Sequence, residues 1–123
     1  MKKLLLILLL GTFMSFSNSE ICKETIASFY GAEHHGKKTA SNEIFNMYDF
    51  TAAHKTLKFG TKVKVTNVNN GKTVVVTVND RGPFKRTPDF KYYSRVLDLA
   101  KGAFLKIASA GTGVIKIKYE ILE

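Results

Sequence analysis

The strongest constraint on the fold is a pair of alternating apolar segments on either side of an Asn-Gly turn signal. In 62–68, KVKVTNV, the two valines nearest the start share one face of an extended chain, and lysines and threonine share the other. Asn-Asn-Gly follows at 69–71, and Asn-Gly tolerates the positive φ angles of a type I′ turn. A return strand over 72–79 completes the predicted β-hairpin. Val75 makes this strand apolar on both faces at one level, which indicates a central strand.

The return strand ends in the charged and rigid sequence TVNDRGPF. Counting by twos places Val74, Val76, Val78 and Asp80 on one face, so we expect the Asp80 carboxylate in line with the core valines. Partial burial there would raise the pKa of the carboxyl group, as a general acid requires, whereas the neighbouring Arg81 would favour the charged form. Because Asp is also a common turn residue, the position alone leaves both roles open.

Further short elements extend this hairpin into a small all-β protein. Strands are predicted over 25–30 and over 115–121, where isoleucines and a tyrosine alternate with Lys and Glu. A helix is predicted over 99–108 with Asp98 as its N-cap, and a short helical turn over 51–54. Several short strands and one or two small helices in about 100 residues predict a small β-barrel.

The N-terminal segment is typical of an export signal. Residues 1–19 combine two lysines with an unbroken aliphatic run and a series of small residues, which describes a secretory signal peptide better than an uncleaved membrane anchor. The mature domain is then 20–123. Cys22 is the only cysteine, so an intrachain disulfide is excluded. A lipid anchor on Cys22 is an alternative, but Glu and Ile precede it where lipoprotein signals have a small residue, so we expect no stable membrane anchor.

The chain is strongly basic. Its formal net charge is +9, and removal of the signal segment leaves 17 Lys and Arg against 10 Asp and Glu, a net charge of +7. A basic domain favours nucleic acid, an anionic membrane surface or an acidic glycan polymer, and export favours the wall polymer. Because the aromatic and basic motifs of a nucleic-acid module are absent from the sequence, we expect no nucleic-acid partner. Lysines on alternating strands are also ordinary solvent-facing residues.

Candidate catalytic groups are few. The sequence has no recognised Ser or Cys nucleophile motif, phosphate loop or dinucleotide fingerprint. His34 and His35 are adjacent but lack the Cys or Glu cluster of a zinc site, so we expect neither a metal nor a cofactor. Paired carboxylates for glycosidic chemistry are possible, with Glu43, Asp80 and Asp98 as the available acids.

Six blocks of the sequence, taken in order, resemble one protein family. Over nearly the whole mature chain the sequence is similar to the septal ring lytic transglycosylases of the rare lipoprotein A family. Two of the blocks, TAAHKTLKFGT and VNDRGPF, are far more specific than a short motif. The blocks are ASFYG (27–31), HGKKTASNE (35–43), TAAHKTLKFGTKVKVTN (51–67), NGKTVVVTVNDRGPF (70–84), LDLA (97–100) and GVIKIKYEIL (113–122).

The resemblance implies a fold and an activity. The fold is a six-stranded double-psi β-barrel with one or two short helices, which expansins share. The activity is that of a lyase, endolytic or exolytic, which cleaves peptidoglycan glycan strands, preferably those without stem peptides, between N-acetylmuramic acid and N-acetylglucosamine. The products carry 1,6-anhydro ends. A monomer in the periplasm or cell envelope is expected, with peptidoglycan as its partner.

The resemblance also assigns residues. It carries the family's catalytic acid onto Asp80 and its supporting polar residues onto Glu43 and His54, although a lone His in an apolar setting is otherwise a packing residue. One carboxyl group suffices, because it can protonate the departing oxygen and then accept a proton from the 6-hydroxyl of the sugar. The expected substrate contacts are Asn79, Arg81, Gly82, Tyr30 and Thr39.

The sequence departs from the family pattern in four respects. Asn42 stands where the family usually has Gly, which Asn can replace in a left-handed conformation, and Ala100 stands where Ser is usual. The connection 85–95 is longer than usual, and its Tyr92 and Tyr93 either stack on sugars or cover the barrel. We expect no C-terminal SPOR domain after the barrel, which leaves recruitment to the division site without its usual module.

A different class of function fits the same fold. A non-catalytic, expansin-like module that binds peptidoglycan and loosens the wall would need the barrel but no acid. The joint presence of the three candidate catalytic residues favours the enzyme.

Overall fold

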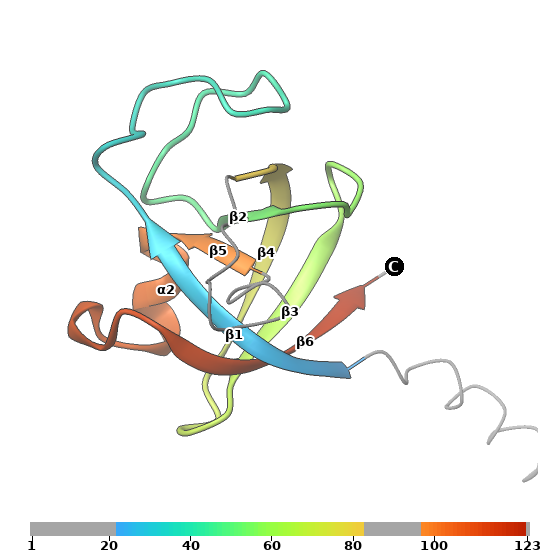
Figure 1. The fold of residues 1–123 in the computed structure, drawn as a ribbon, viewed down its shortest axis with the longest axis vertical. Helices are drawn as coiled ribbons and strands as arrows, with labels where there is room; N and C mark the ends of the chain where they lie inside the picture. Colours follow the sequence, from blue (N-terminus) through green and yellow to red (C-terminus); the bar gives the residue numbers. More distant parts are fainter. Residues whose placement is uncertain (1–21, 83–96, 123) are drawn as a thin grey trace, which may run out of the picture.

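The structure, a computed structural model, describes residues 22–82 and 97–122, which form a closed barrel of six strands. The strands follow one another around the barrel in the order β1-β5-β2-β4-β3-β6, and β6 pairs with β1 to close it (Figure 1). The predicted all-β fold and six-stranded barrel are therefore confirmed. The strands are β1 (Cys22–Tyr30), β2 (Thr51–His54), β3 (Lys62–Asn67), β4 (Thr73–Asp80), β5 (Leu97–Ala100) and β6 (Ile115–Leu122).

The barrel mixes parallel and antiparallel pairs. The pairs β1–β5 and β2–β4 are parallel, and the other four pairs are antiparallel. A parallel pair needs a long connection, since its strands run in the same direction. In both parallel pairs the two strands are separated in the sequence by at least one other strand. The segment 31–50 joins β1 to β2, and Figure 1 shows it beyond one end of the barrel, with the β3–β4 hairpin at the opposite end. The arrangement is consistent with a double-psi β-barrel.

The predicted alternation along the long strands is confirmed. In β3 and β6 the valines, isoleucines and tyrosine point inward, while the lysines are exposed. Burying apolar side chains stabilises the fold by about 25 cal/mol per Å² removed from water, and this interior is continuous across all six strands. The fully buried side chains include Val63, Val65, Val76, Val78, Leu97, Leu99 and Ile117.

Two short segments differ from their predicted structure. Residues 51–54 form β2 rather than a helical turn, because they pair with β4 on one side and with β5 on the other. Asp98 lies inside β5 and is not a helix cap; its Oδ1 accepts a hydrogen bond from Ser28 Oγ at 2.9 Å. In both cases pairing with distant strands decides the structure of a segment too short to carry a clear periodicity.

The helix that follows β5 is shorter than predicted. Helix α2 (Lys101–Ile107) has Ala100 as its N-cap, without a side-chain hydrogen bond, and a 3-10 turn η2 (Ala110–Thr112) leads to β6. Phe104 and Ile107 of α2 are fully buried in the barrel core. Helix packing therefore closes one part of the barrel interior.

The hairpin turn also differs from the prediction. A type I′ turn needs positive φ at both central residues, but Gly71, with φ 77°, has a positive φ and Asn70 does not. The Asn67 side chain shapes the turn instead. Its Oδ1 accepts from the Asn69 backbone N–H at 3.0 Å, and its Nδ2 donates to the Ile107 carbonyl at 2.7 Å. The turn is thus tied to the end of α2.

Val75 does not have the environment that its apolar character suggests. Strand β4 is paired on both sides, by β2 and β3, so it is central in the sheet as predicted. The Val75 side chain nevertheless points away from the core and is 43% exposed. In a closed barrel every strand has two neighbours, so central pairing does not require apolar residues on both faces.

Gly102 permits a close backbone approach. Its N–H donates to the Met47 carbonyl at 2.7 Å, and a Cβ at this position would overlap the Tyr48 carbonyl. In an exposed helix, Ala would be about 1 kcal/mol more favourable than Gly. Here we expect Gly102→Ala to lower the free energy of unfolding by about 1–3 kcal/mol, because the backbone must shift. Urea denaturation measures the change.

Gly111 provides the matched control for this substitution. A Cβ at Gly111 would meet no atom within 4 Å. We therefore expect Gly111→Ala to change the free energy of unfolding by less than about 1 kcal/mol. If both variants were as stable as the wild type, the close packing of segment 47–48 against α2 would not limit stability.

Several sequence predictions lie outside the described residues. They are the signal segment 1–19 and the two tyrosines at 92 and 93 in the connection 85–95. Within 22–82 and 97–122, the structure has no helix that is both long and apolar enough to cross a membrane.

Candidate functional site

The end of β4 is bulged, and the bulge decides which way Asp80 faces. Ala52 pairs with Val78, but the next residue, Ala53, pairs with Asp80, so Asn79 is an extra residue on β4. The expected placement of Asp80 in line with the core valines is therefore wrong. Paired residues share a face, so Asp80 lies with Ala53 on the outer side of the barrel wall.

Asp80 belongs to a row of residues that crosses neighbouring strands on this outer face. Ser28 of β1 pairs with Asp98 of β5, and Asp98 pairs with Ala53 of β2, which pairs with Asp80 of β4. Two of the three candidate acids thus lie on one face. They are separated by a single strand, since β2 runs between β5 and β4.

Three donors hold the Asp80 carboxylate. Oδ1 accepts from the backbone N–H of Ala40 at 3.0 Å and of Arg81 at 2.8 Å, and Oδ2 accepts from the Tyr30 hydroxyl at 3.4 Å. Hydrogen bonds to a carboxylate fix its orientation and stabilise its negative charge. The side chain is therefore positioned by β1, by the segment 31–50 and by the residue that follows β4.

Tyr30 is the buried donor to the Asp80 carboxylate. Its ring is stacked on Phe45 with centroids 4.5 Å apart, and only 8% of the residue is exposed. Burial, followed by the negative charges of Asp80 and Asp98, raises the pKa of the Tyr30 hydroxyl far above its usual value. Tyr30 therefore stays protonated and remains a donor. The structure therefore places this predicted substrate contact in a buried position, where its hydroxyl group is directed at the partly buried Asp80 carboxylate.

The segment 39–43 forms a compact turn over the end of β4. Thr39 is buried, and its N–H and Oγ1 both donate to the Glu43 carbonyl, at 2.7 and 3.1 Å. Asn42 has φ 74°, so the left-handed conformation expected for Asn in place of Gly is confirmed. The Ser41 N–H donates to the Asn79 carbonyl at 3.3 Å and ties the turn to the bulge.

Asn79 connects this turn to the second candidate acid. Its Nδ2 donates to Glu43 Oε1 at 3.1 Å, while the residue itself is 5% exposed. Its Oδ1 is buried without a hydrogen-bond partner among the described residues. A buried unsatisfied acceptor is costly, and such groups are concentrated at functional sites. Glu43 and Asp80 are thus brought together, through the adjacent residue Asn79 and the turn 39–43.

His54 lies on the other side of the barrel wall. Ala53 packs outside the barrel core, in a separate apolar cluster with Tyr30. Because side chains alternate along a strand, His54 then points inward. The centroid of its ring is 6.3 Å from that of Tyr119. Its Nδ1 accepts from the backbone N–H groups of Thr56 and Leu57, at 3.1 and 3.0 Å. Among the described residues, no hydrogen bond joins the imidazole to Asp80 or Glu43.

Arg81 links the His54 segment to the end of β4. Its guanidinium donates to the carbonyls of His54 and Leu57, at 2.9 and 2.6 Å, and lies 4.0 Å from the centroid of the Phe59 ring. The guanidinium is therefore directed at the segment 54–59, whereas the Arg81 backbone N–H contacts Asp80. Gly82 follows with φ 62°, a left-handed conformation that favours glycine.

We expect the protein to lose stability through His54 as the pH falls. Burial, and secondly the positive charge of Arg81, lower the pKa of His54 from its ordinary value of 6.5. As the pH falls through about 6.5 the unfolded chain takes up a proton that the folded chain does not, so the free energy of unfolding decreases. The decrease ends when the folded imidazole is also protonated. Thermal denaturation across this pH range measures it.

His54→Asn is the control for this pH dependence. Asn can offer an acceptor to Thr56 and Leu57, and it does not titrate. The exposed His34 and His35 are unchanged in the variant. The variant should therefore show a smaller decrease in Tm between about pH 7 and pH 5 than the wild type. An identical decrease in both proteins would contradict a role for His54.

His34 and His35 have local partners. His35 Nδ1 accepts from the Met47 N–H at 3.1 Å, and the His34 ring meets the Tyr30 ring edge-on at 5.6 Å. In the part of the chain that the structure describes, no group of three or more His, Cys, Asp or Glu side chains could hold a metal ion.

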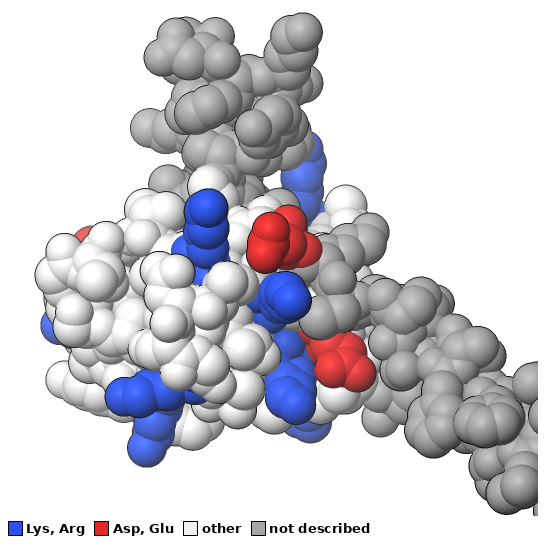
Figure 2. Space-filling view, turned by 90° about the horizontal axis from the view of Figure 1, so that it is seen from below, with Lys and Arg blue, Asp and Glu red and all other residues white. Residues whose placement is uncertain are grey.

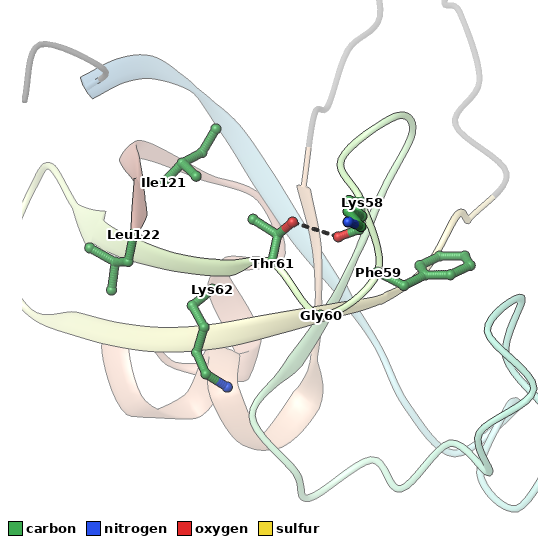
Figure 3. A pocket seen from close by; sticks show the side chains of 7 residues that line it. All are labelled: Lys58, Phe59, Gly60, Thr61, Lys62, Ile121 and Leu122. Carbon is green, nitrogen blue, oxygen red and sulfur yellow. Dashed lines mark hydrogen bonds between the residues drawn. The ribbon is translucent and has the colours of Figure 1, made fainter. Parts of the chain in front are cut away.

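A pocket lies beside this site, on the far side of Phe59. Its volume is about 410 Å³. Figure 3 shows its lining side chains, with Ile121 and Leu122 of β6 opposite the chain that leads into β3. The backbone of this chain is bonded to β4, because Gly60 N–H donates to the Val78 carbonyl at 2.8 Å and Val78 N–H donates to the Thr61 carbonyl at 2.9 Å.

Sequence reasoning missed two contacts of the Asp80 carboxylate. The Ala40 N–H and the Tyr30 hydroxyl are 40 and 50 residues away from the carboxylate that they hold. No local pattern indicates such partners, because tertiary contacts alone bring them together. Asn42 next to Glu43 was the available signal that a tight turn lies here.

The chain matches a family model described as "Lytic transglycolase" over residues 23–119. It is 44% identical over 113 residues to "Probable endolytic peptidoglycan transglycosylase RlpA" of Synechocystis, covering 92% of this chain and 33% of the relative. It is 48% identical over 94 residues to "Endolytic peptidoglycan transglycosylase RlpA" of Pseudomonas aeruginosa, covering 76% of this chain and 26% of the relative. The chain thus spans a third or less of these relatives.

Solved structures with the same fold are more distant. The Streptomyces papain inhibitor has a TM-score of 0.65 at 20% identity, over 86% of this chain and 98% of its own. The expansin of Clavibacter michiganensis has a TM-score of 0.61 at 21% identity, over 83% of this chain and 50% of its own. A mutant of that expansin, in complex with cellohexaose, has a TM-score of 0.60 at 20% identity, over the same shares. These likenesses show the fold alone.

Proposed function

Because the chain belongs to the lytic transglycolase family, we propose that it is a lytic transglycosylase of peptidoglycan. It cleaves glycan strands between N-acetylmuramic acid and N-acetylglucosamine and leaves 1,6-anhydro ends. The observation that carries the proposal is the Asp80 carboxyl group, held by three donors on the outer face of the barrel, with Glu43 beside it.

Asp80 is the proposed catalytic acid and base. Its carboxyl group donates a proton to the glycosidic oxygen while the bond from this oxygen to the anomeric carbon breaks. The 6-hydroxyl of the same muramic acid then bonds to the anomeric carbon and returns its proton to the Asp80 carboxylate. The step consumes no water, and the enzyme ends in its starting protonation state.

The other residues have supporting roles in this proposal. Tyr30 and the Ala40 N–H fix the carboxyl group, so that its proton is delivered in one direction. Glu43 is exposed and held by Asn79, from where it can accept a hydrogen bond from a sugar hydroxyl or amide. Thr39 positions Glu43, because it holds the turn in which Glu43 lies. His54 positions Arg81, because its backbone carbonyl accepts a hydrogen bond from the guanidinium group.

The relatives are named endolytic, and we propose the same mode of cleavage here. The wall substrate implies a cell-envelope location, with residues 1–19 as the export signal and 20–123 as the mature domain. Peptidoglycan is the proposed partner, and neither a cofactor nor a second subunit takes part in the step above.

Digestion of purified sacculi and of peptide-free glycan strands, followed by mass spectrometry, tests the proposal. We expect anhydro-ended fragments that are long at early times, as internal cleavage requires. A hydrolase would instead leave reducing ends, each one water heavier.

A non-catalytic wall-binding module is the second candidate. The fold likeness to an expansin that was solved in complex with cellohexaose favours it. A protein that pellets with sacculi but releases no anhydro-ended fragment would support this candidate and contradict the enzyme.

A further inference from the structure

Asn79 holds the second candidate acid at a cost in stability. Its side chain is almost fully buried, and its Nδ2 donates to Glu43 Oε1 at 3.1 Å. Because a carboxylate oxygen only accepts, the amide nitrogen must face Glu43. The amide oxygen Oδ1 is then left in a buried position where no described residue donates to it. A buried acceptor without a partner destabilises the folded state, so its presence requires an explanation.

The bulge in β4 lets two adjacent side chains contact the same turn. In a regular strand, successive side chains point to opposite faces, whereas Asn79 is an extra residue between two paired positions of β4. Asn79 donates to Glu43, and the next residue, Asp80, accepts from the Ala40 N–H at 3.0 Å. Glu43 and Ala40 both belong to the turn 39–43. The end of β4 therefore fixes this turn at two points.

The contacts of Asn79 differ from those expected of a residue that binds substrate. Its amide nitrogen is directed at Glu43, and its amide oxygen is buried. Glu43, in contrast, is exposed, and its Oε2 accepts no hydrogen bond from a described residue. Of the two side chains, Glu43 is the one that a sugar can reach. These contacts favour an indirect role for Asn79 over the direct substrate contact that the sequence predicts.

We propose that Asn79 is a positioning residue, which orients the Glu43 carboxylate for the glycan and does not bind the glycan itself. The Nδ2 donor fixes one carboxylate oxygen and leaves the other for a sugar hydroxyl or amide. A free glutamate side chain loses conformational freedom when it binds, and one that is already held loses less. The inference rests on the proposed function, in which Glu43 contacts the substrate.

The proposal predicts opposite effects on stability and on binding. Asn79→Leu keeps the shape of the side chain but has neither the donor nor the unsatisfied acceptor, and the exposed Glu43 carboxylate stays hydrated. Replacing a buried polar group by an apolar group of the same shape is nearly neutral or stabilising when no partner is left unsatisfied. We therefore expect Asn79→Leu to have a Tm equal to or above that of the wild type, although it binds glycan more weakly.

Calorimetry with soluble, peptide-free glycan oligomers measures this binding in a double-mutant cycle. All chains carry Asp80→Asn, so that cleavage does not interfere. We expect Asn79→Leu to weaken binding about tenfold, as the loss of a hydrogen bond to a charged group does. In the Glu43→Ala background the same substitution should change the affinity by less than about twofold, because the group that Asn79 positions is no longer present.

Asn69→Leu is the matched control. Asn69 is exposed in the β3–β4 turn, opposite the segment 31–50, at the end of the barrel from which Figure 2 is seen. Figure 2 shows basic side chains spread over this face, with acidic side chains among them. Neither leucine substitution alters the net charge, so the general attraction between a basic protein and an anionic glycan is the same in both. Asn69→Leu should therefore bind like its parent.

An exchange of donor and acceptor gives a second, independent test. Asn79→Asp removes the donor without changing the shape of the side chain. When Glu43→Gln is added, the new glutamine amide can donate to the new carboxylate, which restores the hydrogen bond in the opposite direction. The combined variant should bind the oligomers more tightly than Asn79→Asp alone.

Three results would overturn the inference. Equal binding by Asn79→Leu and its parent would exclude a role for Asn79. The same loss with and without the Glu43 side chain would make Asn79 a direct substrate contact. A lower Tm for Asn79→Leu, with no gain from the exchanged pair, would make it a structural residue. Release of anhydro-ended fragments by the wild type is measured separately, so failure of the proposed function is distinguishable from failure of this inference.

Discussion

Asp80→Asn is expected to lower the release of anhydro-ended fragments by about 10²- to 10⁴-fold, the contribution typical of a positioned acid and base. Asn has nearly the shape of Asp, and its Oδ1 can still accept from the Ala40 and Arg81 N–H groups. It cannot deliver or take up a proton. Mass spectrometry of digested peptide-free glycan strands measures the loss.

The control for Asp80→Asn must convert another carboxylate, away from the proposed site, to an amide. Asp49→Asn removes an exposed carboxylate from the segment 31–50, which also carries Ala40 and Glu43, and we expect wild-type activity. Thermal denaturation should give similar Tm values for both variants, because neither change creates a cavity. Full activity of Asp80→Asn would exclude Asp80 as the acid, whereas loss of binding together with activity would indicate a misfolded site.

Phe104→Ala is expected to produce the largest loss of stability, about 3–5 kcal/mol in the free energy of unfolding. Phe104 is fully buried, and its ring lies 4.6 Å from the ring of Phe29. Truncation removes apolar contacts and leaves a cavity between α2 and the barrel strands. Since domains are stable by only about 5–15 kcal/mol, a measurable fraction of the chains would be unfolded. Urea denaturation measures the shift in midpoint.

Leu105→Ala is the matched control on the same helix. Leu105 is 48% exposed, so its truncation should cost less than about 1 kcal/mol. Phe104→Leu keeps most of the buried volume and should fall between the two. If Phe104→Ala and Leu105→Ala were equally stable, α2 would not contribute to the core as the structure places it.

The sequence predicted the long strands correctly but not the short ones. The alternation in 62–67, 73–80 and 115–122 was sufficient to identify three strands and their buried faces. The segments 51–54 and 97–100 are four residues long, too short for a period of two to be distinguished from a helical turn. Their structure comes from pairing with strands on both sides.

The candidate site was predicted in part. The resemblance assigned Asp80 and Glu43. In the structure Glu43 accepts a hydrogen bond from Asn79, the residue before Asp80, and Asp80 accepts one from Ala40 in the turn that carries Glu43. The predicted direction of the Asp80 side chain was wrong. A single extra residue in β4 moves every side chain after it to the opposite face of the strand. The contact of Tyr30 with Asp80 depends on residues 50 positions apart and has no local signal.

The sequence by itself determined the class of fold, the inward faces of the long strands and the left-handed turn at Asn42. These features depend on side-chain alternation and backbone preference within short windows of chain. Only the tertiary structure decided that Asp80 faces Tyr30 on the outer wall, that His54 faces inward, and that the chain around Phe59 lines a basic pocket. The first depends on the bulge at Asn79, and the other two depend on the pairing of strands that are distant in the sequence.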